Sequence, residues 1–284
     1  MRRFVVLAAA TAVTLIGSTA QACPSGPLRG WRQVDHTTVS ATTGNEGVTT
    51  VRPPHGKAYL AFRGAGAIPQ PLKDEGWGHV GDPDSTRGYV VDAYQNTRDV
   101  PAPNKMFLVT SPTGETHEYV HKLQPEEPAA NANAQVAITP DAHWLVAGPL
   151  GQVNQLFVYP LALDGHGGDL PLVAHVNLDH PIRNAQGCDF LSETRMLCGT
   201  SDPKNDLYPT SFQLLQIDLA RPIRGRDVTA HVTSLGQVPL VSTCTTTDFV
   251  TEGVDWDAAT GQLRIEVNPP TGCNSQTDVY TFRR

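Results

Sequence analysis

Polar side chains with ligand-binding chemistry recur at matching places along this sequence, each at the start of a short strand-like run. They are Glu46, His79, Gln135, Gln186 and Glu252, and three asparagines (Asn45, Asn133 and Asn184) lie one or two residues ahead of Glu46, Gln135 and Gln186. Carboxylate and amide oxygens are the ligands that Ca²⁺ prefers, and the same groups hydrogen-bond to sugar hydroxyls. If strands bring them around one axis, they form a calcium site, a site for a sugar or another small ligand, or the lining of a water-filled channel.

The elements that carry these residues repeat along the chain. Each unit begins with two short strand-like runs separated by a turn, at residues 46–51 and 57–62, 79–82 and 89–94, 135–138 and 144–147, 186–190 and 196–198, and 252–256 and 263–267. Two more strand-like runs follow in most units. Four antiparallel strands per repeat predict a small closed β-propeller, an all-β fold, over residues 31–284.

The two ends of the chain complement each other. The last unit has only a third strand, at residues 279–282, and the run at residues 31–39 can supply its fourth. Closing the ring in this way removes two sheet edges that would otherwise be open to aggregation. We predict five blades, or four if the Gly- and Pro-rich stretch 64–77 is an insertion.

The units resemble blades of secreted bacterial propellers, the group that includes NHL- and YVTN-type repeat proteins and calcium-dependent lactonase-like hydrolases. In the lactonase-like proteins, acidic and amide residues at the channel mouth hold calcium, which polarises an ester. The resemblance implies Glu46, Asn133, Asn184 and Glu252 as the matching positions. No blade carries the regular Tyr-Val-Thr-Asn motif. Residues 78–84 and 179–181 also resemble segments of a family of secreted bacterial proteins to which no activity is attached.

Two functions remain open at this point. The first is a non-catalytic propeller that binds a glycan, peptide or protein at the channel mouth. It is favoured because the sequence holds no His-Glu-x-x-His, Gly-x-Ser-x-Gly, phosphate-binding or dinucleotide-binding motif. The alternative is a metal-dependent hydrolase of an ester, lactone or glycoside, with Glu46 and Glu252 as metal ligands or as an acid/base pair. Whether the protein is an enzyme is left undecided.

The beginning of the chain reads as an export signal. Arg2 and Arg3 precede an apolar run at residues 4–16, and Ala20-Gln21-Ala22 matches a signal-peptidase site. Residues 1–22 are therefore predicted to be a signal peptide and residues 23–30 a short linker, which makes the protein secreted. Lipid anchoring at Cys23 is the minor alternative, since a cysteine directly after a signal segment can be acylated.

Cysteine spacing agrees with an oxidising compartment. Cys188 and Cys198 flank one hairpin and Cys244 and Cys273 flank another, so we predict bridges 188–198 and 244–273. Loss of the two basic residues with the signal changes the net charge from −7 to −9. This acidic balance argues against nucleic acid as a partner, and no later segment is apolar enough to enter a membrane. We expect a monomer.

Overall fold

The computed structural model describes residues 28–96, 104–128, 132–240, 249–270, 272 and 275–284. Within these ranges β-strands predominate, and the helical elements are the short η1 (Ala65–Ala67) and α1 (Gln70–Asp74). The predicted all-β class is therefore confirmed. No helix in the described ranges is long and apolar enough to cross a membrane. The predicted signal peptide, residues 1–22, lies outside the described residues, as does most of the predicted linker.

The two ends of the described chain share one sheet. Its strands lie in the order β1 (Arg32–Ser40), β20 (Gln276–Arg283), β19 (Gln262–Asn268) and β18 (Val250–Asp257). Strand β1 pairs antiparallel with β20, with Thr37 opposite Val279. The N-terminal strand thus completes the C-terminal sheet, as the complementary ends predict.

An eight-stranded sheet combines two repeat units. Its order is β14 (Ala185–Ser192), β15 (Arg195–Ser201), β16 (Phe212–Leu219), β17 (Val228–Gln237), β13 (Ala174–Arg183), β11 (Gln152–Pro160), β10 (Trp144–Gly148) and β9 (Gln135–Ile138). The outer strands β13 and β17 join the two units through a parallel pairing of residues 176–178 with residues 228–230. The repeat pattern did not predict this link, because it depends on how neighbouring units are placed.

The remaining strands form a six-stranded and a two-stranded sheet. The larger consists of β12 (Gly168–Asp169), β8 (Thr116–Lys122), β7 (Asn104–Thr110), β6 (Tyr89–Gln95) and β4 (His79–Val80), with β5 (Asp84–Thr86) also paired to β6. The smaller pairs β2 (Gly47–Val51) with β3 (Tyr59–Arg63). The Gly- and Pro-rich stretch after β3 holds η1 and α1 instead of further strands, because its prolines cannot donate ladder hydrogen bonds.

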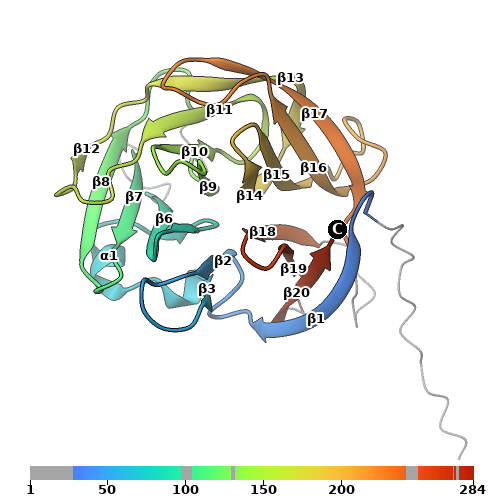
Figure 1. Ribbon diagram of the computed structural model, residues 1–284, viewed down its shortest axis with the longest axis horizontal. Helices are drawn as coiled ribbons and strands as arrows, with labels where there is room; N and C mark the ends of the chain where they lie inside the picture. The colour runs from blue at the N-terminus through green and yellow to red at the C-terminus, as the bar shows by residue number, and fades with distance from the viewer. Residues whose placement is uncertain (1–27, 97–103, 129–131, 241–248, 271, 273–274) are drawn as a thin grey trace, which may run out of the picture.

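The first strand of every unit lies near the centre of the molecule, and the sheets surround it (Figure 1). Contacts run from β2 to β5, from β5 to β9, from β9 to β14, from β14 to β18, and from β18 back to β2. These five inner strands therefore form a closed circuit.

Glycines let the inner strands approach one another closely. A Cβ placed on Gly47 would lie 2.3 Å from a carboxylate oxygen of Asp82, and one on Gly187 would lie 2.1 Å from the carbonyl oxygen of Glu252. Asp82 itself is fully buried and accepts hydrogen bonds from the backbone N–H groups of Val48 (3.0 Å) and Val254 (3.2 Å). The strands meet at this level, and Asp82 ties three of them together.

The predicted bridge between Cys188 and Cys198 is confirmed. The two residues lie directly opposite each other on β14 and β15, with their Cα atoms 4.1 Å apart. Cys23, Cys244 and Cys273 lie outside the described residues, so the second predicted bridge stays a prediction.

Candidate functional site

Four of the predicted site residues gather at the start of the inner strands. His79 Nε2 lies 3.5 Å from Glu46 Oε2, and the charge of Glu46 acts on Glu252. The Gln186 side chain faces Glu252 and lowers its pKa, although Gln186 Nε2 makes no hydrogen bond of regular geometry. Burial has the larger effect and holds the pKa of Glu252 well above its usual range. The sequence alignment of units is thus supported at these positions.

Glu266 and Asp82 add two further carboxyl groups to this cluster. Glu266 of β19 is fully buried, and neither of its carboxylate oxygens has a hydrogen-bond partner. Burial and the charge of Glu46 raise the pKa of Glu266. Burial also raises the pKa of Asp82, although the hydrogen bonds that its carboxylate accepts from two backbone N–H groups act in the opposite direction. Burial likewise raises the pKa of Glu46 from 4.5 to about 7. We call Glu46, Asp82, Glu252 and Glu266 the mouth carboxyls.

Gln135 and Asn133 are held nearby on β9 and just ahead of it. Both are fully buried, and the Gln135 backbone bridges to that of Asp82. Asn133 Nδ2 donates to the carbonyls of Tyr94 (3.0 Å) and Met106 (3.3 Å), so its amide group fastens β9 to the preceding sheet. Asn133 Oδ1 and both polar atoms of the Gln135 amide have no partner.

The residues that the family resemblance implies as calcium ligands do not fit one site. Asn184 Oδ1 accepts a hydrogen bond from the backbone N–H of Gly151 at 2.9 Å, so the side-chain oxygen of Asn184 points toward the Gly151 backbone. Asn133 Nδ2 donates to two carbonyl groups, whereas Asn133 Oδ1, the atom that would bind a cation, has no hydrogen-bond partner. In the described ranges, no three His, Cys, Asp or Glu side chains are grouped so as to hold a metal ion.

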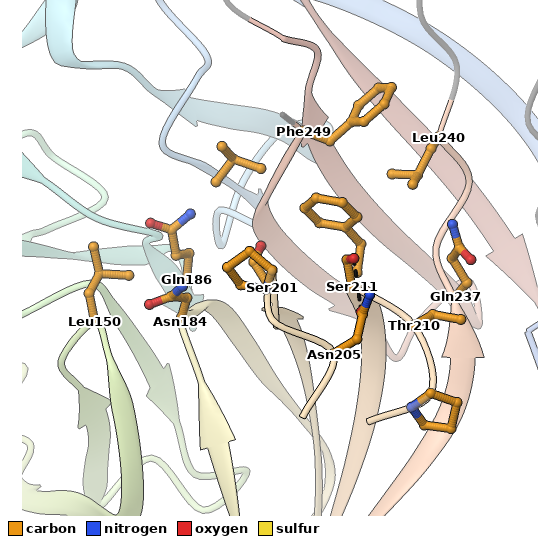
Figure 2. A pocket seen from close by; sticks show the side chains of 14 residues that line it. Leu150, Asn184, Gln186, Ser201, Asn205, Thr210, Ser211, Gln237, Leu240 and Phe249 are labelled. Atoms are coloured by element: carbon orange, nitrogen blue, oxygen red, sulfur yellow. Dashed lines mark hydrogen bonds between the residues drawn. The ribbon is translucent and has the colours of Figure 1, made fainter. Parts of the chain in front are cut away.

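A cavity of about 700 Å³ is lined in part by Gln186, one of the residues gathered at the start of the inner strands (Figure 2). The side chains of Asn184 and Gln186 line one side, while Asn205, Thr210, Ser211 and Gln237 lie across from them. The rest of the lining consists of Ser201 and of the apolar residues Leu150, Pro203, Pro209, Phe212, Leu240, Phe249 and Val250. None of these described lining residues carries a formal charge.

The backbone of this cavity is unusual at two lining positions. Asn184 (φ 47°) and Asn205 (φ 51°) adopt the left-handed conformation, which only two other non-glycine residues share in the described chain. Asparagine tolerates this conformation better than most residues, and such positions concentrate at ligand-binding sites. In addition, Ser201 Oγ and Gln186 Nε2 are buried without hydrogen-bond partners. Two of the lining side chains therefore hold a buried polar atom without a regular hydrogen-bond partner.

A second set of buried carboxyls lies at the opposite end of the inner strands. Each ties its strand to the next, since Asp84 accepts from the N–H of Ile138, Asp189 from Trp256 and Asp255 from Thr50. Burial raises the pKa of Asp84 to about 7, and it raises those of Asp189 and Asp255 as well. Because one oxygen of each carboxyl accepts a hydrogen bond from a neighbouring strand, we assign a structural role to these three aspartates.

Sequence reasoning missed Glu266 and most of the cavity. Glu266 had a usable signal, since it is the one carboxylate in the strand-like run 263–267. The cavity residues had none, because Ser201, Thr210 and Gln237 come from separate strands and loops with ordinary compositions. Only Asn184 and Gln186 belong to both the predicted site and the cavity.

Comparison with known proteins adds little. No family model and no curated protein matches the chain. Among solved structures, a mutant of the apocarotenoid oxygenase from Synechocystis is similar over 68% of this chain and 58% of its own length, with 8% identity and a TM-score of 0.33.

Proposed function

We propose that this protein is an exported five-bladed β-propeller that binds a glycan at one end of its axis. The closed circuit of five inner strands supports five blades, with the two-stranded β2–β3 sheet as the reduced first blade. The β1–β20 pairing supports closure of the last blade by the N-terminal strand. Polar ligands commonly bind where the inner strands of such a ring begin, because side chains from every blade meet there.

The observation that carries the proposal is the chemistry of the 700 Å³ cavity. The described lining residues supply amide and hydroxyl groups and carry no formal charge, and Phe212 and Phe249 add apolar surface. Sugars match this combination, because their hydroxyl groups donate and accept hydrogen bonds while their C–H faces pack on apolar side chains. The described lining residues offer no charged side chain to pair with the charged termini or side chains of a typical peptide.

The metal-dependent hydrolase is the weaker alternative. Asn184 Oδ1, one of its implied calcium ligands, already accepts a hydrogen bond from Gly151, and no three His, Cys, Asp or Glu side chains of the described ranges are grouped so as to hold a metal ion. The carboxyls of Glu46 and Glu252 are close enough to influence each other, but neither lines the cavity. A binding function needs neither group to react.

The test is a glycan array probed with the labelled mature protein, followed by calorimetry on the best neutral oligosaccharide. We expect Gln186→Ala and the cavity-filling Thr210→Trp to weaken binding at least tenfold, which corresponds to about 1.4 kcal/mol. Gln33→Ala, on an exposed position of β1, serves as the control and should bind normally. Equal binding by all three variants would place the glycan elsewhere, and an array without any bound glycan would refute the function.

Export is supported by the signal-like residues 1–22 and by the Cys188–Cys198 disulfide, a kind of bond typical of oxidising compartments. N-terminal sequencing of protein recovered outside the cytoplasm should begin at Cys23. A chain that keeps residues 1–22 would contradict the proposed cleavage.

A further inference from the structure

The two asparagines with left-handed backbones present the same chemical group to the cavity. Asn184 (φ 47°) and Asn205 (φ 51°) line it from opposite sides (Figure 2). Asn184 Oδ1 accepts a hydrogen bond from the backbone N–H of Gly151 at 2.9 Å, and Asn205 Oδ1 accepts one from the Ser211 hydroxyl, also at 2.9 Å. Neither Nδ2 group has a hydrogen-bond partner among the described residues. The protein thus occupies the oxygen of each amide and leaves its two N–H donors for a ligand.

The bond to Gly151 fixes which way the Asn184 amide points. A backbone N–H can only donate, so the atom that accepts it is the amide oxygen, and the amino group lies on the other branch of the side chain. The left-handed backbone, which asparagine adopts more readily than most residues, holds this arrangement. A ligand therefore meets a donor at Asn184 that cannot become an acceptor without breaking the bond to Gly151.

Ser211 supplies an acceptor on the side of the cavity opposite Asn184. Its hydroxyl hydrogen goes to Asn205 Oδ1, so Ser211 Oγ keeps its lone pairs, and the residue also lines the cavity. Figure 2 shows Ser211 and Asn205 together, across from Asn184. A donor on one wall thus stands opposite an acceptor on the other.

Apolar side chains lie beside these polar groups. Phe212, Leu240 and Phe249 line the cavity, and each is less than a tenth exposed. The two phenyl rings meet edge to face with their centroids 6.1 Å apart. A methyl group of a ligand packed against these side chains is removed from water, which favours binding.

These groups together fit an acetamido substituent. It carries a carbonyl oxygen, an N–H and a methyl group, and because its amide bond is trans, the carbonyl oxygen and the N–H point in opposite directions. The carbonyl oxygen can face Asn184 while the N–H faces Ser211. A hydroxyl group would leave the apolar side chains unused, and an ammonium group would set its donors against those of the two asparagines.

We propose that the cavity binds the acetamido group of its ligand, so that the glycan recognised is built from N-acetylated amino sugars. This inference rests on the proposed glycan-binding function and specifies its substrate class. Asn184 Nδ2 donates to the acetamido carbonyl, Ser211 Oγ accepts its N–H, and Phe212, Leu240 and Phe249 cover its methyl group. Asn205 Nδ2 is left for a hydroxyl group of the sugar.

The experiment compares two matched probes by calorimetry, a β-1,4-linked N-acetylglucosamine tetramer and cellotetraose, which has a hydroxyl group in place of each acetamido group. We expect the N-acetylated tetramer to bind at least about tenfold more tightly. Asn184→Asp keeps an oxygen for Gly151 but replaces the donor with a second acceptor, so it should reduce the preference to less than about twofold. Asn154→Asp adds the same charge at an exposed position of β11 outside the cavity and should keep the preference.

A second variant tests the opposite wall independently. Ser211→Ala removes the proposed acceptor of the acetamido N–H and should lower the affinity for the N-acetylated tetramer more than that for cellotetraose. Thermal unfolding of each variant verifies folding.

The outcomes separate this inference from the function on which it rests. Equal affinity of the native protein for the two tetramers, or a preference that survives in both Asn184→Asp and Ser211→Ala, overturns the acetamido site and leaves glycan binding intact. Binding of N-acetyl-trialanine amide, but of neither tetramer, supports the acetamido site and refutes the glycan. If none of these three probes binds, the inference is wrong, and the glycan array decides separately whether the cavity takes another sugar.

Discussion

The buried carboxyls predict that this protein is more stable in mild acid than at neutral pH. Glu46 has a pKa of about 7 in the folded protein and 4.5 as an ordinary residue, and Asp84 has about 7 against 3.8. The folded state thus binds more protons than the unfolded state over this interval. The stability contributed by each group is complete below its unfolded pKa and is lost as the pH rises through the folded value near 7.

The size of the effect follows from the shifts. One pKa unit corresponds to about 1.4 kcal/mol, so Glu46 alone accounts for about 3 kcal/mol and Asp84 for about 4 kcal/mol. The free energy of unfolding should therefore fall by about 3–5 kcal/mol between pH 5 and pH 8. Glu127 acts in the opposite sense, because hydrogen bonding to His121 and the charge of Lys105 outweigh burial and lower its pKa to about 2, but its contribution is lost only below about pH 4.5.

Urea unfolding followed by tryptophan fluorescence at four pH values from 5 to 8 measures this directly. Glu46→Gln removes the titrating group and should flatten the curve by about 3 kcal/mol, while Glu115→Gln should leave it unchanged. A stability that rises or stays level from pH 5 to pH 8 in the native protein would refute the reasoning, because it would mean that these carboxyls are ionised without cost.

Three further changes test the fold. Gly187→Ala should destabilise the protein by about 3 kcal/mol or more in urea unfolding, because the new Cβ would lie 2.1 Å from a backbone oxygen of β18. A loss under 1 kcal/mol would show that β14 and β18 are farther apart than described. Trp31→Ala should cost about 3–5 kcal/mol by the same assay, since this buried ring packs edge-on against Trp256 at 5.7 Å in the closing sheet; an unchanged midpoint would mean that the N-terminal strand does not close it. Replacing both Cys188 and Cys198 by Ala should lower stability by about 3 kcal/mol, given the short loop that they close, and thermal unfolding identical to that of the oxidised protein would contradict the bridge.

Part of the candidate site was accessible from sequence. The alignment of repeat units placed Glu46, Gln186 and Glu252 at equivalent positions, and the structure brings these three together with His79. Asn184 was aligned in the same way, yet its side-chain oxygen accepts from Gly151. The difference is local, because the left-handed backbone of this residue turns the amide toward the chain, and no spacing rule anticipates that rotation.

What the sequence determined by itself is local in range. Alternating apolar runs and turn residues define hairpins, and the symmetric spacing around one of them places Cys188 opposite Cys198. The complementary ends specify that β1 joins β20, since an unpaired edge on the last sheet needs a partner.

Tertiary structure alone decided how the inner strands meet. Asp82 reaches Val254, which lies 172 residues away, and Glu266 enters the mouth cluster from a second strand. The neutral cavity likewise combines residues from three regions, including Asn184, Thr210 and Phe249. Hydrophobic periodicity reports which face of a strand is buried, but the position of one strand relative to another is set by packing across the whole ring, and that packing is where this site is made.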